Sequence, residues 1–237
     1  MHFQHSGAIW RDFPELVAGA LFAEGITAGA PAGDHAAKFT AIASSRLAGR
    51  PESELPEIRA WRHAFARMGL KPTQYRCAAE SLLRRFRKQG ALPRPHPLVE
   101  VCNAVSLAFA IPVAVFDVAA VTGDLQVRHA IGDEEYLTFS GQCEHPGPGE
   151  VIFADQAHQV HARRWTNRQS GLSAVGASTT AALIVAEAMH STAASDVPRL
   201  IAAIAGELDA IWSITPAATV LRQASPRFTF QPRPQRQ

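Results

Sequence analysis

The chain has 237 residues, of which 47% are hydrophobic and 19% are charged, and its formal net charge is +2. This length and composition support one large domain with a sizeable buried core, and the near-neutral charge requires any nucleic-acid-binding surface to be local. The three cysteines are widely spaced, which argues against a disulfide framework or a zinc site. The sequence shows no basic segment followed by an apolar run, as a signal peptide would have, and no apolar run long enough to span a bilayer. These features predict a cytoplasmic protein.

The first predicted element, residues 16–26, fits either a helix or a buried strand, because its small side chains blur the period. Residues 34–47 are predicted to form a helix with Asp34 as its N-cap. Residues 54–68 indicate a clearer helix, since apolar side chains recur along it at intervals of three and four. These side chains are Ile58, Trp61, Phe65 and Met68.

Residues 73–88 give the strongest helical signal, with one apolar face, Thr73 as the expected N-cap and Gly90 just beyond the C-terminus. The remaining surface of this helix is rich in basic residues. They are either phosphate contacts for RNA or an ordinary solvated face, and the sequence leaves both interpretations open. The candidate RNA-binding residues are Arg76, Arg84, Arg85, Arg87 and Lys88.

The second half of the chain combines helices with short strands. Helices are expected at 98–109, where the helix is apolar on most sides, at 179–190 and at 197–212. We therefore predict an α+β fold, with a mixed, mostly antiparallel sheet of short strands flanked by helices, in a single domain over residues 1–224. The basic, proline-containing residues 225–237 are predicted to form a disordered tail. The expected strands are 112–118, 125–130, 136–140, 151–155 and 159–165.

The segment HARRWTNRQS, residues 161–170, concentrates hydrogen-bond donors directly after a strand pattern. Strand alternation would place His161, Arg163 and Trp165 on one face. An arginine beside a tryptophan there would suit stacking on a base or clamping a phosphate. The alternative is a structural Arg163, paired with a carboxylate such as Asp155, and a Trp165 packed in the core.

The spacings of familiar catalytic motifs are missing from the sequence. GLSAVG, residues 171–176, is one residue longer than a nucleophile elbow, and neither a Walker loop nor a G-x-G-x-x-G after a strand occurs. His158 and His161 would lie on opposite faces of a strand, so no metal site is predicted, and no cofactor is implied.

An ordered set of residues in the middle of the chain resembles a known module. An acid, a helical asparagine, a proline, an aromatic–aspartate pair, a glycine turn and V-R-x-A occur in that order, followed by an aspartate and S-x-V-x-x-x-T. This order is similar to that of the B3/B4 module, the editing domain of the phenylalanyl-tRNA synthetase β subunit. The residues are Glu100, Asn103, Pro112, Phe116, Asp117, Gly123, Val127, Arg128, Ala130, Asp155, Ser173, Val175 and Thr179.

The stand-alone B3/B4-domain proteins resemble the chain more fully, over residues 71–188. Three motifs of these proteins have counterparts in this sequence. They are P-x-x-Y-R before an arginine-rich helix, Gly-Glu before a strand, and R-R-W-x-x-R-x-S. Ala114, however, stands where the synthetase module has a histidine, and Gln169 and Ser170 replace its paired glycines. The counterparts are Pro72, Tyr75, Arg76, Gly149, Glu150, Arg163, Arg164, Trp165, Arg168 and Ser170.

This resemblance implies a domain that accepts the 3′ end of an aminoacylated tRNA and hydrolyses a wrongly attached amino acid. Because an aminoacyl ester is already activated, such a site needs hydrogen-bond donors and a positioned water rather than a protein nucleophile. The residues expected to line this substrate pocket are Asn103, Glu150, Asp155, His161, Arg163, Trp165, Arg168, Ser170 and Thr179.

Three functions remain open from the sequence. The first is a tRNA-interacting protein that deacylates mischarged aminoacyl-tRNA in trans. The second is a module that binds tRNA or another structured RNA without chemistry. The third is a small-molecule enzyme or binding protein that uses the same pocket for a free amino acid or related carboxylate, which Arg163 would hold as a two-pronged donor. None of them implies a membrane partner or sequence-specific DNA binding.

Overall fold

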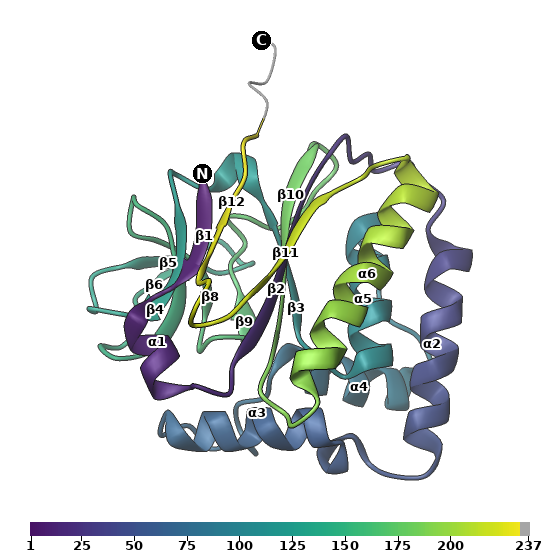
Figure 1. The fold of residues 1–237 in the computed structure, drawn as a ribbon, viewed down its shortest axis with the longest axis horizontal. Coiled ribbons are helices and arrows are strands. Elements are labelled where there is room, and N and C mark those ends of the chain that lie inside the picture. The colour runs from purple at the N-terminus through teal and green to yellow at the C-terminus, as the bar shows by residue number, and fades with distance from the viewer. Residues whose placement is uncertain (233–237) are drawn as a thin grey trace.

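Two β-sheets pack face to face, and helices cover the outer face of one of them (Figure 1). The structure is a computed structural model and describes residues 1–232. The smaller sheet is antiparallel throughout, in the order β11 (Ala217–Leu221), β2 (Val17–Glu24), β10 (Ala181–Ala188) and β3 (Val113–Asp117).

The larger sheet has eight strands and mixed pairing. β1 pairs in parallel with β4, and β5 with β8, while its other pairs are antiparallel. Its order is β12 (Arg227–Thr229), β1 (His2–His5), β4 (Leu125–His129), β7 (Val151–Ala154), β8 (Gln159–Arg163), β5 (Glu135–Leu137) and β6 (Cys143–Glu144), with β9 (Arg168–Gln169) also paired to β8. The predicted α+β class, with a mixed and mostly antiparallel arrangement of short strands, is confirmed.

Six α-helices lie among the described residues, and three of them form a layer on the smaller sheet. That layer is α2 (Gly33–Ala48), α5 (Pro97–Phe109) and α6 (Ala193–Trp212), as Figure 1 shows. The space between the two sheets holds the other core, to which α3 contributes buried apolar side chains. The remaining helices are α1 (Gly7–Asp12), α3 (Pro56–Arg67) and α4 (Ala78–Gln89), with two short 3-10 turns at Glu52–Glu54 and Val118–Ala120.

The smaller sheet is buried on both faces, which explains the composition of its central strands. β2 reads VAGALFAE and β10 reads AALIVAEA, and nearly all of these residues are buried. A strand covered on both sides is expected to be apolar throughout instead of alternating. α6 approaches so closely that a Cβ added at Gly19 would lie 2.4 Å from Cγ1 of Ile201. Small residues in β2 and β10 therefore let the helical layer sit near the sheet.

The predicted helix at 179–190 is wrong, because Ala181–Ala188 form β10 at the centre of the smaller sheet. A short apolar run buried on both faces has no period that separates a strand from a buried helix. Two predicted caps are also wrong. Asp34 lies inside the first turn of α2, and α4 begins at Ala78, with Cys77 and not Thr73 as its N-cap. Gly90 ends α4 as predicted, with a φ of 69°.

Part of the predicted disordered tail is folded. Arg227–Thr229 form β12, which pairs with β1, and the side chains of Phe228 and Phe230 are buried. The two phenylalanines stack on one another with ring centroids 5.5 Å apart, so apolar packing outweighs the proline-rich composition here. The rest of the predicted tail, residues 233–237, lies outside the described residues.

Candidate functional site

The donor-rich segment 161–170 forms a tight β-hairpin. β8 ends at Arg163, the chain turns through Arg164 and Trp165, which have positive φ values of 46° and 58°, and β9 returns from Arg168. The predicted strand to 165 is therefore too long, and Trp165 does not alternate with Arg163. The turn sends the indole of Trp165 into the core instead, where it is fully buried and packs edge-on against Trp61 at 5.1 Å.

Arg163 is a structural arginine held between two carboxylates. Its Nε and Nη2 donate to the two oxygens of Glu150 at 2.8 and 2.9 Å, and its Nη1 donates to Glu144 at 2.6 Å. These hydrogen bonds raise the pKa of Arg163. Burial raises the pKa of Glu150, but the bonds from Arg163 outweigh burial and hold it below its usual value. The structural alternative is right for Arg163, although its partner is Glu150 and not Asp155.

His161 and Asp155 form a second buried pair, with Nε2 of His161 3.2 Å from Oδ2 of Asp155. Asp155 also accepts hydrogen bonds from the backbone amides of Thr122, Ala157 and Gln159, and so fixes the turn between β7 and β8. Burial raises the pKa of Asp155, but the bonds from His161 and these amides outweigh it, so the pKa lies below the ordinary value. Both side chains hold the loop and have no exposed surface.

Ser170 and Thr179 also bond to the protein itself. The Ser170 hydroxyl, fully buried, donates to the carbonyl of Leu137 at 2.8 Å. The Thr179 hydroxyl donates to Asp117 at 2.6 Å and accepts from the amide of Gly176. These bonds fix the path of the chain from β9 to β10.

A pocket of about 60 Å³ opens between the two sheets, and we call it the intersheet pocket. Of the predicted pocket residues, it brings together Trp165 and Arg168, and it also includes Ala114, the position that differs from the synthetase module. The hydroxyl of Thr166, also in its wall, is buried and has no hydrogen-bond partner among the described residues. The lining residues are Ala78, Pro112, Val113, Ala114, Phe153, Ala162, Trp165, Thr166, Asn167, Arg168, Gln169, Val185 and Glu187.

Glu187 is the polar centre of the intersheet pocket, and the sequence analysis missed it. Its side chain is 2% exposed, and its Oε1 accepts hydrogen bonds from Nε2 of His5 at 2.6 Å and from Nε1 of Trp165 at 2.8 Å. Both donors use Oε1, so neither of them occupies Oε2. A glutamate within the apolar run AALIVAEAM was the available signal, because a charged residue is rarely buried without a function or a partner.

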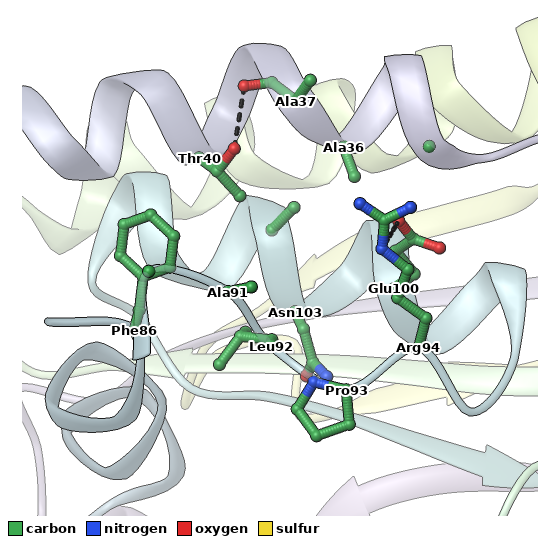
Figure 2. Close-up of a pocket in the computed structure, with 13 residues that line it drawn as sticks. Ala36, Ala37, Thr40, Phe86, Ala91, Leu92, Pro93, Arg94, Glu100 and Asn103 are labelled. Carbon is green, nitrogen blue, oxygen red and sulfur yellow. Dashed lines mark hydrogen bonds and ion pairs between the residues drawn. The ribbon is translucent and has the colours of Figure 1, made fainter. Parts of the chain in front are cut away.

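Asn103 lies elsewhere, in a second pocket of about 130 Å³ on the helical side of the smaller sheet. Figure 2 shows it between α2, α5 and the segment that follows α4, with the amide of Asn103 beside Pro93 and with Arg94 over Glu100. The expectation that Asn103 converges with Arg163 and Trp165 is therefore wrong. α5 packs on the face of the sheet that points away from the intersheet pocket.

The basic surface of α4 is partly neutralised by buried acids. Glu52 accepts from Arg84 at 3.1 Å and from Arg87 at 3.0 Å, and Glu80 pairs with Arg62 and with Arg76, which precedes the helix. The exposed Arg85 donates to the side chain of Gln89, and Lys88 is also exposed. Within residues 1–232 neither of these two forms an ion pair. They are the members of the predicted set that are available to a phosphate.

Three further observations concern the cysteines, the metal-ligating side chains and the helix lengths of the described residues. Burial raises the pKa of Cys77 and of Cys102 to about 12, so both thiols are protonated and weakly nucleophilic at neutral pH. No group of three metal-ligating side chains gathers within residues 1–232. In the same residues, no helix is both long enough and apolar enough to cross a bilayer.

Two known proteins are similar to parts of this chain. The chain is 36% identical over 73 residues to the phenylalanine–tRNA ligase β subunit of Cereibacter sphaeroides, which covers 31% of this chain and 9% of that protein. A crystal structure of an N-terminal fragment of the phenylalanyl-tRNA synthetase β subunit from Pyrococcus horikoshii superposes with a TM-score of 0.48 and 9% identity, over 90% of this chain and 49% of that one. The chain thus spans less than a tenth of the curated relative.

The family model described as the B3/4 domain matches residues 60–201, which is more than half of the chain. That range contains both strands of the 161–170 hairpin, Ala114 and Glu187, so the matched region includes every residue that lines the intersheet pocket. The chain belongs to the B3/4 domain family.

Proposed function

We propose that the protein hydrolyses the ester bond of a mischarged aminoacyl-tRNA in trans, with the amino acid held in the intersheet pocket. The observation that carries the proposal is Glu187, a buried carboxylate in a pocket whose wall also contains a Thr166 hydroxyl without a hydrogen-bond partner within residues 1–232. The relative from Cereibacter sphaeroides is a tRNA ligase subunit by name, which supports an RNA-linked substrate.

The charges of the pocket suit an ester-linked amino acid better than a free one. Glu187 is the one acid among the lining residues, and it is buried, whereas the cationic Arg168 is exposed. An aminoacyl ester has an α-ammonium group but no free carboxylate, and its RNA carries phosphates outside the pocket. A buried anion and an outer cation match this distribution. Arg163, which a free amino acid would need, already pairs with Glu144 and Glu150.

The proposed chemistry uses water as the nucleophile. The water oxygen bonds to the ester carbonyl carbon, the bond from that carbon to the ribose oxygen breaks, and the ribose oxygen takes up a proton. Oε2 of Glu187 accepts the proton that the water loses and then gives it to the departing ribose oxygen, while His5 and Trp165 hold the carboxylate through Oε1. The buried cysteines take no part, since an activated ester needs no covalent intermediate.

A panel of mischarged tRNAs tests the proposal. Wild-type protein is expected to release the amino acid from at least one of them, with small apolar amino acids preferred over aromatic ones. The reason for this preference is the volume of about 60 Å³ and the small apolar side chains of Ala78, Ala114, Ala162 and Val185 in the wall. Loss of the ester is followed with radiolabelled amino acid, and a protein that leaves every ester intact would contradict the proposal.

A second candidate function is RNA binding without chemistry, which the exposed Arg85 and Lys88 of α4 favour. If these two side chains contact phosphates, the double variant Arg85→Ala/Lys88→Ala should flatten the dependence of log K on log salt by roughly 1.5 to 2. The measurement is uncharged tRNA binding at several salt concentrations. The matched control is Arg199→Ala/Arg222→Ala, which removes two exposed cations elsewhere. Equal slopes for the two double variants would show that α4 only faces solvent.

A further inference from the structure

A hollow of about 410 Å³ lies beside the turn between β5 and β6, and we call it the Phe139 hollow. The ring of Phe139 is 74% exposed there, more than the other large exposed hydrophobic residues of the described chain, Ile42 and Ile131. A phenylalanine of this exposure loses hydrophobic stabilisation unless something covers it. The lining residues are Tyr136, Thr138, Phe139, Ser140, Arg168 and Gln169.

The turn that carries Phe139 is held firmly. The Thr138 hydroxyl lies 2.9 Å from that of Ser140 and accepts from the amide of Gln142 at 3.0 Å. The amide of Gly141 closes the turn by donating to the carbonyl of Thr138. The exposed ring is therefore presented by an ordered turn, which lowers the conformational entropy that a stacked ligand would have to remove.

Arg168 gives the hollow a cationic part. The guanidinium of Arg168 lies 5.3 Å from the ring centroid of Tyr136, and its Nη1 lies 3.3 Å from Glu144. The Tyr136 hydroxyl donates to the carbonyl of Gln169 at 2.8 Å. A stacking ring beside a positive charge is the combination that single-stranded nucleic acid requires, whereas a protein partner would be expected to meet a larger apolar patch.

Strand β9 joins this hollow to the intersheet pocket. Arg168 and Gln169 line both. The side-chain Nε2 of Gln169 donates to the carbonyl of Val115 in the smaller sheet, and its backbone carbonyl accepts from the Tyr136 hydroxyl beside the hollow. A ligand that spans β9 would thus have one part beside Glu187 and another beside Phe139. An aminoacyl nucleotide has such a two-part form.

We propose that the Phe139 hollow binds the terminal nucleobase of the aminoacylated RNA, which stacks on the ring of Phe139 while Arg168 meets the adjacent phosphate. This inference rests on the proposed function, because it assigns the hollow to the same substrate. Stacking is tolerant of base identity, so the hollow contributes affinity for any RNA end that carries the ester, and the intersheet pocket selects the amino acid.

The test uses the trinucleotide 5′-CCA-3′, the sequence that ends tRNA, and the full-length variant Phe139→Trp. Stacking is expected to quench the fluorescence of the added indole, measured against the four native tryptophans, and ribose 5-phosphate is expected to leave it unchanged. In Phe139→Ala the affinity for the trinucleotide, measured by calorimetry, should fall by about five-fold to 150-fold. Ile42→Ala, which removes an exposed side chain from α2, should bind as wild type does.

The outcomes separate this inference from the proposed function. If wild type hydrolyses an aminoacyl ester and Phe139→Ala has the same KM and the same trinucleotide affinity, the hollow is not the base site, although the proposed function stands. If the trinucleotide binds in a manner that depends on Phe139 and no ester is hydrolysed, the base site stands and the proposed chemistry fails. Equal quenching by ribose 5-phosphate would also overturn the inference, since that ligand has no base.

Discussion

Replacing Arg163 by methionine is expected to lower the free energy of unfolding by about 3–5 kcal/mol, measured by urea denaturation. Arg163 is 5% exposed, and its guanidinium makes three hydrogen bonds to Glu144 and Glu150. Methionine preserves much of the side-chain volume but leaves Glu150 partly buried without its partner. The penalty arises from this uncompensated carboxylate more than from the lost contact itself.

Two further variants identify the cause of that loss. Arg163→Met/Glu150→Leu should recover much of the stability, because removing both members of a buried pair leaves no orphaned charge. The guanidinium of Arg168 also reaches Glu144 but is more exposed. Arg168→Met should therefore lower the free energy of unfolding by less than about 1 kcal/mol. A double variant as unstable as Arg163→Met alone would contradict the proposed origin of the penalty.

The pair of Arg163 and Glu150 also predicts that the free energy of unfolding depends on pH. The folded pKa of Glu150 lies below its ordinary value of 4.5, so the unfolded state binds the proton more readily. The stabilisation is therefore complete above about pH 4.5 and is lost as the pH falls through the folded pKa. Wild type should lose more stability than Arg163→Met between pH 5 and pH 3, and parallel acid profiles would exclude this linkage.

Replacing Glu187 by glutamine is expected to lower kcat/KM for ester hydrolysis by about 10²-fold to 10⁴-fold. The amide oxygen can still accept from His5 and Trp165, so the pocket keeps its shape while it loses the group that receives the proton from water. The measurement is ester release from the best substrate of the mischarged panel under single-turnover conditions. Near-ultraviolet circular dichroism checks that the buried indole of Trp165 remains in place.

Glu207 provides a matched control on α6. It is also a buried glutamate hydrogen-bonded to a histidine, with its Oε2 2.8 Å from Nδ1 of His35, but it lines neither the intersheet pocket nor the Phe139 hollow. Glu207→Gln should leave hydrolysis unchanged even if it lowers stability. Equal loss of activity in the two variants would assign the effect to folding and remove Glu187 from the chemistry.

The sequence predicted the elements that have a clear local pattern of apolar residues and missed those that have none. The helices at 54–68 and 98–109 have apolar positions at helical spacing or a long apolar run, and both exist within a residue or two of the expected bounds. β10 was expected as a helix because its alanines are compatible with both a helix and a strand. It forms a strand because it pairs with β2 on one side and β3 on the other, at the centre of the smaller sheet. β1 and β12 are short strands, and their pairing joins residues more than 220 positions apart in the chain, which local patterns cannot indicate.

The candidate site was predictable in composition but not in geometry. The segment 161–170 does border a pocket, but it does so through Ala162, the turn and β9 and not through Arg163, because the positive φ values at Arg164 and Trp165 end the strand alternation. Arg163 was a candidate ligand-binding group because its pairing with Glu144 and Glu150, 19 and 13 residues earlier, depends on how β6, β7 and β8 are arranged. Glu187 lay inside an apolar run without a motif around it, and its role depends on His5, 182 residues away.

The contact between His5 and Glu187 also limits how the family domain can be isolated. The region that matches the B3/4 domain, residues 60–201, excludes β1, which supplies His5, and β2, which lies between β10 and β11. Excising that region would expose one long edge of β10 and leave the pocket acid without one of its two donors. We therefore expect the smallest autonomous unit of this protein to include the amino-terminal strands, and functional work should use fragments that retain them.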